Sequence, residues 1–223
     1  VSQPTVMSRS DDGGKTWKSH EVVHGGDVEI LSDGTFLRIS ADSGPGAEGP
    51  AEIFSSTDEG RTWNTWSKLE LDLPVKHTER YFPRALTRIS DDLLIWGVQA
   101  RGVEYKGNTD DDRVGYVKGD HYLFSYISRD GGINWEGPVV MLASGYGSEG
   151  GVVKLPSGKL LATIRYSRPG WKHVWLVESD DDGLSWVNGR QLTTVHGQCH
   201  GQPTSLPDGT VLVIYDHRYG PDG

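Results

Sequence analysis

Charged side chains flank the apolar segments of this sequence, and their types could bind an anionic ligand. The residues that lead into these segments are Asp27, Arg84, Glu149, and His200 with Gln202. The residues that follow them are Arg38, Gln99 with Arg101, Arg165, and His217 with Arg218. A charge beside a buried strand is unfavourable unless it is paired or binds a ligand. Because the planar fork of arginine holds a carboxylate through two parallel hydrogen bonds, acids and arginines that converge predict a site for an acidic sugar.

Glu149 and Arg165 are the strongest pair among these residues. They stand sixteen residues apart in SEGGVVKLPSGKLLATIR, at the two ends of one predicted hairpin. Both ends of that hairpin open on the same face of the expected fold, so the two side chains would reach a common ligand. The alternative is a buried ion pair that joins the two strands, and it stays open.

A repeated turn indicates which elements position these residues. The pattern S-x-D-x-G-x-[T/S/N]-W occurs four times, at 10–17, 56–63, 128–135 and 179–186. Each copy lies between alternating segments, which predicts a hairpin turn. The aspartate would bond its own turn, glycine would supply a positive φ, and tryptophan would pack under the next blade. These turns lack the ligand series of a calcium loop, so we expect no metal and no cofactor.

A second hairpin repeats between these copies, with turns at positions 34, 92, 158 and 209. Its second strand is almost wholly apolar at 93–96, 160–164 and 211–214, which predicts strands buried on both faces. The turn-to-turn spacings of 58, 66 and 51 residues suit four-stranded blades. The sequence therefore predicts an all-β propeller with three whole blades and two halves. The halves could pair into a four-bladed ring, but we favour part of a larger ring.

These repeats resemble those of the sialidase (neuraminidase) superfamily, whose aspartate-box, or BNR-repeat, propellers have six blades. The resemblance implies that about four blades are present here and that residues 1–223 form a single domain, incomplete at both ends. In that family three arginines clamp the substrate carboxylate, and a glutamate activates a tyrosine nucleophile. The resemblance implies that Arg165 is the middle of these three arginines and that Glu149 is the catalytic base. Ser148 stands before this glutamate, where the family usually has asparagine. The other arginines, the tyrosine and the acid/base aspartate would lie outside 1–223, so this segment alone would be inactive.

The remaining candidate substrate contacts are Arg84, Asp27 and Arg218. Arg84, in YFPRAL, only loosely resembles the family's first arginine motif, and a structural ion pair is the alternative. Asp27 matches no family motif. Trp171 and Tyr146 could stack on a sugar or simply pack, and the insertion with Asp110, Asp111 and Asp112 could form a rim or a solvated loop.

The composition of the chain excludes some classes of binding partner. The 223 residues carry a formal net charge of −9 with scattered Lys and Arg, which argues against a nucleic acid partner or an anionic membrane surface. No apolar run is long enough to span a membrane. The lone Cys199 excludes an internal disulfide and is expected to be a small buried thiol rather than a nucleophile served by His196 or His200.

The sequence and the resemblance together predict an exo-acting glycoside hydrolase, first of all an exo-α-sialidase that releases terminal sialic acid from glycoconjugates. One alternative is a non-catalytic glycan-binding propeller. Another is a sialidase-like glycosidase or lyase for a different acidic sugar. An extracellular or periplasmic location follows from the substrate class, because such glycans lie outside the cytoplasm.

Overall fold

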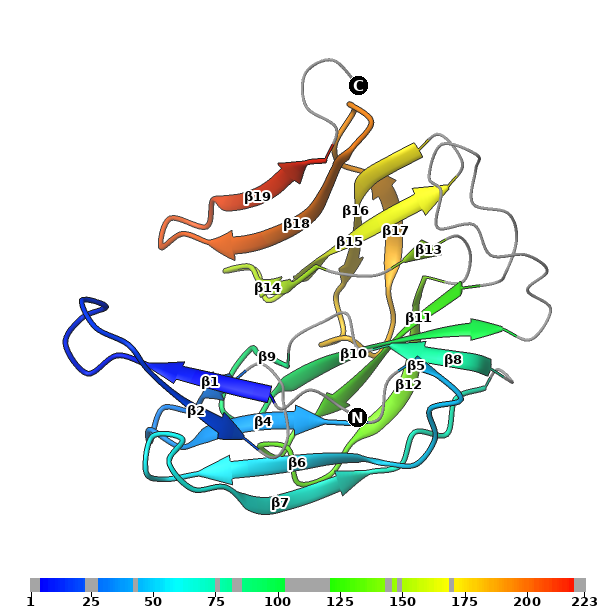
Figure 1. Cartoon of the computed structure of the whole chain (residues 1–223). Helices are drawn as coiled ribbons and strands as arrows, with labels where there is room; N and C mark the ends of the chain where they lie inside the picture. Colours follow the sequence, from blue (N-terminus) through cyan, green and yellow to red (C-terminus); the bar gives the residue numbers. More distant parts are fainter. Residues whose placement is uncertain are drawn as a thin grey trace.

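The computed structural model describes residues 5–22, 28–41, 44–74, 77–81, 86–102, 121–142, 146–147, 150–168 and 171–218. All helix or strand structure in these ranges is β-strand, as the sequence predicts. Among these residues there is no helix that could span a membrane. The strands form four hydrogen-bonded sheets arranged around a common centre (Figure 1).

The first two sheets come from the N-terminal third of the chain. The first is a hairpin of β1 (Thr5–Arg9) and β2 (Lys18–Val22). The second is antiparallel and contains, in spatial order, β3 (Val28–Ile30), β4 (Phe36–Ser40), β6 (Ala51–Ser56) and β7 (Asn64–Leu69). These sheets correspond to an outer half-blade and one whole blade.

The third sheet is a blade whose innermost strand is split into two pieces. It contains β5 (Gly44–Pro45), β8 (His77–Tyr81), β9 (Thr87–Arg88), β10 (Leu94–Gly102), β11 (His121–Ser128) and β12 (Glu136–Leu142). Both β8 and β9 pair with β10, and the short β5 adds to the free edge of β8. This blade therefore has the predicted order of inner hairpin followed by outer hairpin.

The fourth sheet joins a whole blade to an inner half-blade. The blade contains β13 (Tyr146–Gly147), β14 (Val152–Lys154), β15 (Leu160–Arg168), β16 (Trp171–Ser179) and β17 (Val187–Gln191). The half-blade is the hairpin of β18 (Gln198–Ser205) and β19 (Val211–His217). A single parallel pair, His173 with Gln198, links the two parts. The described residues thus contain the three whole blades and two half-blades that the repeats predict.

Strand β10 shows how the blades pack on one another. Leu94 and Trp96 of β10 point into a core shared with the preceding blade. Ile95 of the same strand, and Leu93 just before it, point into a core shared with the following blade. All four side chains are at most 7% exposed. The prediction that this apolar segment is buried on both faces is confirmed, because each face packs against another sheet.

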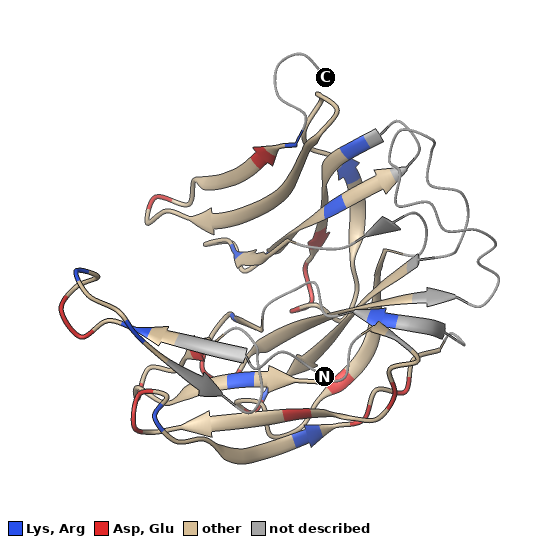
Figure 2. Cartoon of the chain, viewed as in Figure 1, with Lys and Arg blue, Asp and Glu red and all other residues tan. Residues whose placement is uncertain are grey.

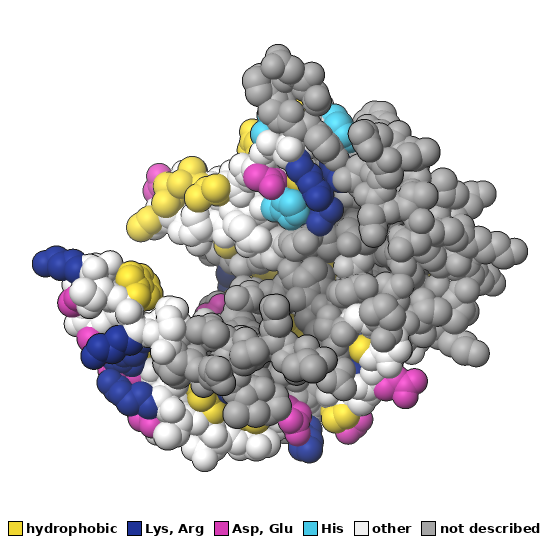
Figure 3. All heavy atoms as spheres, viewed as in Figure 1, with side chains coloured by type: hydrophobic (Ala, Val, Ile, Leu, Met, Phe, Trp, Pro, Cys, Tyr) yellow, Lys and Arg dark blue, Asp and Glu magenta, His cyan; other side chains and the backbone are white. Residues whose placement is uncertain are grey.

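The same prediction is wrong for β19. Its Leu212 and Ile214 side chains are 44% and 71% exposed. Strand β19 lies at the edge of its sheet, and a notch separates the β18–β19 hairpin from β1–β2 on the face shown in Figure 3. Among the described elements, no further sheet packs over these two side chains.

The four aspartate boxes share one hydrogen-bonding pattern. In the third box, Asp130 Oδ1 accepts a 2.8 Å hydrogen bond from the Asn134 backbone, and Ser128 Oγ accepts one of 2.7 Å from the Gly132 backbone. Gly132 has a φ of 86°. The predicted roles of aspartate and glycine in this turn are therefore confirmed.

The predicted position of the box tryptophans is wrong in two respects. Trp186 donates a 3.0 Å hydrogen bond to Ser125 Oγ on β11, so it packs on the preceding blade and not on the next one. Trp17 is 63% exposed, because its hairpin β1–β2 is a half-blade. The boxes nevertheless lie along one face, since Arg9 pairs with Glu59 in the second box and Arg129 with Asp182 in the fourth.

The ends of the inner strands lie on the opposite side from the boxes. The arrows of β4, β15 and β19 all point to the right in Figure 1, whereas the hairpin turns before them and the box turns of the same blades lie toward the left or centre. Residues that leave the second inner strand therefore share one face, as the predicted geometry requires.

Candidate functional site

Arg165 lies near the end of β15 and faces the half-blade β18–β19. Side chains alternate along a strand, and Ala162 and Ile164 of β15 point into the core shared with the preceding blade. Thr163, on the other side, donates a 2.7 Å hydrogen bond to the backbone carbonyl of Gly201 on β18. Arg165 has the same orientation as Thr163, and its side chain is half-buried between the two blades.

The two blades approach closely beside Arg165. A Cβ atom built on Gly201 would lie 2.7 Å from Cγ1 of Val174, which pairs with Arg165 across β15 and β16. Only glycine permits that separation, so a larger residue would force the half-blade outward. The lack of a side chain at Gly201 therefore lets β18 lie against the face that carries Arg165.

A second cation, Lys172, shares this face. Lys172 pairs with Ser167, and Ser167 lies two residues beyond Arg165, so both cationic side chains leave the sheet on the same side. Lys172 is 2% exposed. Burial, together with the nearby charge of Arg218, lowers its pKa to about 8.

Arg218 completes a cationic group around the thiol of Cys199. Its backbone N–H donates a 2.9 Å hydrogen bond to Gly197, which places it directly after β19. Arg165 and Arg218 both act electrostatically on the Cys199 thiol, and Lys172 interacts with the same thiol. Figure 2 shows basic residues on β15 and β16 opposite the acidic tip of β19.

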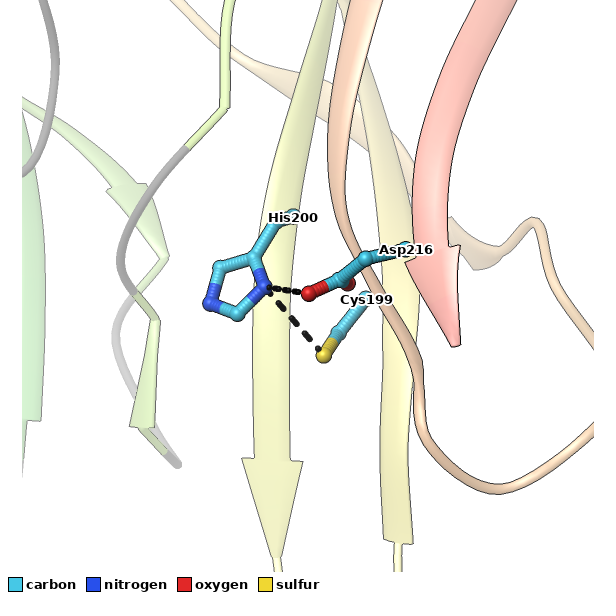
Figure 4. Close-up of side chains that lie close together, drawn as sticks. All are labelled: Cys199, His200 and Asp216. Carbon is cyan, nitrogen blue, oxygen red and sulfur yellow. Dashed lines mark hydrogen bonds and ion pairs between the residues drawn. The ribbon is translucent and has the colours of Figure 1, made fainter. Parts of the chain in front are cut away.

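Cys199, His200 and Asp216 form a compact cluster at this end of the half-blade (Figure 4). His200 Nδ1 lies 2.7 Å from Asp216 Oδ2, and Cys199 Sγ lies 3.6 Å from the same nitrogen. Cys199 is fully buried, whereas the side chains of His200 and Asp216 are 30% and 50% exposed. Acidic, basic and histidine side chains lie together on the corresponding surface in Figure 3.

A β-bulge brings these three side chains together. Between the pairs Cys199–Asp216 and Gln202–Ile214, strand β18 advances three residues while β19 advances two. The bulge includes His200, whose φ of 53° lies in the left-handed region. Consecutive residues of a regular strand point to opposite faces, but a bulge redirects one of them. Both Cys199 and His200 therefore reach Asp216.

Electrostatics within the cluster disfavour a nucleophilic thiol. Burial, reinforced by the Asp216 charge, raises the pKa of Cys199 to about 11, so the thiolate is scarce at neutral pH. Burial also acts to raise the pKa of Asp216, but hydrogen bonds from His200 and Cys199 outweigh it and lower that pKa. The expectation of a small buried thiol at Cys199 agrees with this environment.

The predicted site residues have different outcomes. Asp27, Arg84 and Glu149 lie outside the described residues, so their predicted roles stay predictions. Arg165 and Arg218 lie close to the same thiol, although their contact with substrate remains a prediction.

Arg38 does not lie at the strand ends, contrary to the sequence interpretation. Its guanidinium carbon is 4.1 Å from the ring centroid of Trp63, a box residue, and the side chain is 2% exposed. Arg38 stands halfway along β4, so it reaches the box end of the blade and forms a cation–π contact there.

Sequence reasoning missed Lys172 and Asp216. Counting from the inner turns would have found Asp216, which is the seventh residue after Gly209, as Arg165 is the seventh after Gly158. No comparable signal marks Lys172, because its neighbourhood arises from the packing of β16 against β18.

Comparison with known proteins agrees with this architecture. A family model described as the BNR/Asp-box repeat matches residues 8–19 and 126–136. Among solved structures, a protein of unknown function from Dyadobacter fermentans has a TM-score of 0.67 at 20% identity. That alignment covers 97% of this chain and 65% of the other protein. The chain carries BNR/Asp-box repeats on a sialidase-like β-propeller.

Two glycoside hydrolases show the same propeller fold. An α-L-arabinanase from Penicillium chrysogenum, complexed with arabinobiose, aligns with TM-score 0.60 and 18% identity over 96% of this chain and 70% of that one. The NanB sialidase of Streptococcus pneumoniae, as its K499G mutant, aligns with TM-score 0.57 and 16% identity over 96% of this chain and 32% of that one. No curated protein sequence matches the chain. At these identities the likeness concerns the fold, and the propeller segment spans only part of each structure.

Proposed function

We propose that the protein carrying this chain is an exo-acting glycoside hydrolase for a sugar that bears a carboxylate, with terminal sialic acid as the first substrate to test. The main support is a group of three cations, Arg165, Lys172 and Arg218, that all interact electrostatically with the thiol of Cys199. Positive side chains that converge on one region attract an anion. A substrate carboxylate is the anion that suits a fold shared with sialidases.

The proposed roles follow from side-chain chemistry. Arg165 would hold the carboxylate through its planar fork, and Arg218 would supply a second positive charge at the mouth. Glu149 would act as the base beside the nucleophile, and Arg84 and Asp27 would contact the sugar. An extracellular or periplasmic location accompanies this proposal, because sialoglycoconjugates occur there.

A second candidate is a glycosidase for a neutral sugar. The similarity to an arabinanase complexed with arabinobiose favours it, since that enzyme has the same propeller. The cationic group argues against it, because a neutral furanose carries no carboxylate for Arg165, Lys172 and Arg218 to attract. A non-catalytic glycan-binding propeller is the third candidate.

Hydrolysis assays separate these candidates. The protein would be incubated with fluorogenic α-sialoside, β-glucuronide and α-L-arabinofuranoside, and binding of free sialic acid would be measured by calorimetry. Release from the sialoside supports the proposal. Release only from the glucuronide or only from the arabinofuranoside replaces sialic acid with that sugar. Saturable binding of sialic acid without any release favours a binding module.

A further inference from the structure

We infer that Cys199, His200 and Asp216 form a binding site for a divalent transition-metal ion, with Zn²⁺ as the ion that suits them best. This site adjoins the proposed carboxylate site, because Arg165 and Arg218 act on the Cys199 thiol, but its test does not require hydrolase activity. It departs from the sequence expectation that the chain needs no metal, which rested on the aspartate boxes alone.

The spacing of the three side chains fits such an ion. Their ligand atoms all lie within 4.8 Å of one another, with 2.7 Å between His200 Nδ1 and Asp216 Oδ2 and 3.6 Å between that nitrogen and Cys199 Sγ. Zinc bonds of about 2.0–2.3 Å in a tetrahedron place neighbouring ligand atoms roughly 3–4 Å apart. The Asp216 carboxylate would rotate away from His200 to open that space, and its 50% exposure leaves it free of close packing on the solvent side.

The backbone of β18 directs the Cys199 and His200 side chains toward Asp216. A regular β18 would direct Cys199 and His200 to opposite faces, and the bulge with its left-handed His200 removes that alternation. Gly201, next to His200, lets the bulge lie against the neighbouring blade, because any Cβ at this position would come within 2.7 Å of Val174. Three ligands on the two strands of one hairpin are therefore held without contributions from a distant loop.

The donor set selects the class of ion. A thiolate and an imidazole suit Zn²⁺ and Co²⁺, whereas Mg²⁺ and Ca²⁺ prefer oxygen ligands. On binding, the Cys199 thiol would release its proton to solvent, and a neutral His200 would carry its proton on Nε2 while Nδ1 binds the ion. Thiolate and carboxylate together neutralise the two charges of the ion, which limits its repulsion from Arg165 and Arg218.

Three protein ligands leave a fourth tetrahedral position for water or another small ligand. His200 and Asp216 are partly exposed, so this position has access to solvent from the mouth of the propeller. The arrangement thus matches an open metal site better than a closed structural one.

Cobalt spectroscopy tests the site directly. Because Cys199 is the single cysteine of the chain, any thiolate-to-cobalt charge-transfer band must arise from it. Reduced, metal-free protein titrated with Co²⁺ should develop that band, saturate at a single equivalent and lose the band when Zn²⁺ is added. Zn²⁺ should also raise the melting temperature, because it binds the folded state.

Matched variants identify the ligands. Cys199→Ser should abolish the band, and His200→Asn and Asp216→Asn should weaken Co²⁺ binding at least about tenfold. Asparagine is chosen at His200 because it tolerates the left-handed backbone. Asp208→Asn, at the far turn of the same hairpin, should leave binding unchanged.

Two results would overturn the inference, and neither depends on how well the variants fold. One is a wild-type protein that shows no saturable charge-transfer band and no Zn²⁺-dependent shift in melting temperature. The other is retention of the band in Cys199→Ser, which would place the cobalt elsewhere.

Discussion

Trp186 Nε1 donates a 3.0 Å hydrogen bond to Ser125 Oγ, and this bond joins the fourth aspartate box to the blade before it. The corresponding nitrogens of Trp17, Trp63 and Trp135 instead bond the glycine carbonyl of their own turns. Ser125 is fully buried on β11. The box of the last whole blade therefore contributes to blade docking as well as to its own turn.

Trp186→Phe should lower the free energy of unfolding by about 1–3 kcal/mol, because it leaves a buried hydroxyl without its donor. Trp17→Phe is the matched control, since Trp17 is 63% exposed and bonds only its own turn. The control should change stability by less than about 0.5 kcal/mol. Urea unfolding monitored by circular dichroism measures both, and equal losses would show that the interblade bond contributes nothing.

The box aspartates should stabilise the fold and leave the chemistry alone. Asp181 accepts hydrogen bonds from Ser179, from Ser185 Oγ and from the Ser185 backbone. Asp181→Ala should cost about 0.5–2 kcal/mol, as at a helix N-cap where a carboxylate serves backbone donors, and Asp58→Ala should act in the same direction. The values are modest because Asp181 is exposed and Asp58 is partly exposed.

Asp182→Asn provides the control in the same turn. Asp182 makes only surface ion pairs with Arg129 and Lys154, and asparagine accommodates its φ of 56°. Its loss should stay below about 0.5 kcal/mol. Thermal melts compare the variants, and turnover of the Asp181→Ala protein should match the wild type below the melting temperature. Lost turnover at an unchanged melting temperature would contradict the scaffold role.

Glu178 should make the fold sensitive to acid. Hydrogen bonds from Arg190, Asn188 and Lys159 lower its pKa from the usual 4.5 to about 2. A carboxyl with a lowered folded-state pKa stabilises the protein above its unfolded-state pKa and loses that contribution as the pH falls. The stabilisation is therefore complete above about pH 4.5 and fades toward pH 2.

Glu178→Gln should consequently be less stable than the wild type at neutral pH by about 1–3 kcal/mol, as for a lost charge-assisted hydrogen bond. The difference should shrink between about pH 4.5 and pH 2, because protonation removes the same charge from the wild type. Asp180→Asn, which removes a 68% exposed carboxylate beside Lys159, should behave like the wild type. A stability difference that does not vary with pH would assign the loss to packing.

The blades could be predicted from the sequence because their signals are local. All the hydrogen bonds of a box turn lie within eight residues, such as 128–135 in the third box. A short sequence pattern is therefore sufficient to identify the turn. The burial of β10 on both faces likewise follows from its own apolar run.

The features that sequence reasoning missed depend on contacts between distant residues. The place of Arg38 depends on Trp63, twenty-five residues later, whose ring attracts its guanidinium away from the strand end. Asp216 contacts His200 only because a bulge inserts one residue into β18. No local sequence pattern predicts that bulge. The direction in which Trp186 packs depends on the order of the blades around the ring.

The last prediction concerns Arg165, the described residue that the proposed function depends on most. Arg165→Lys keeps the positive charge but loses the planar fork, so the variant should bind a carboxylate through fewer hydrogen bonds. A lost charge-assisted pair is worth about 1.5–3 kcal/mol, which corresponds to a rise of about ten- to a hundredfold in the KM for a fluorogenic sialoside. Glu149→Gln should instead reduce kcat, because it removes the predicted base and retains most of the shape.

Arg129→Lys is the matched control for Arg165→Lys. Arg129 lies in the third box, on the face opposite the strand ends, and makes only surface contacts with Glu136 and the fourth box. Its KM should equal that of the wild type. Melting temperatures measured in parallel separate lost binding from lost folding. If Arg165→Lys keeps the wild-type KM while remaining folded, Arg165 is a structural partner of the Cys199 cluster, and the carboxylate must be held elsewhere. If both arginine variants raise KM equally, the effect arises from net charge and not from the fork.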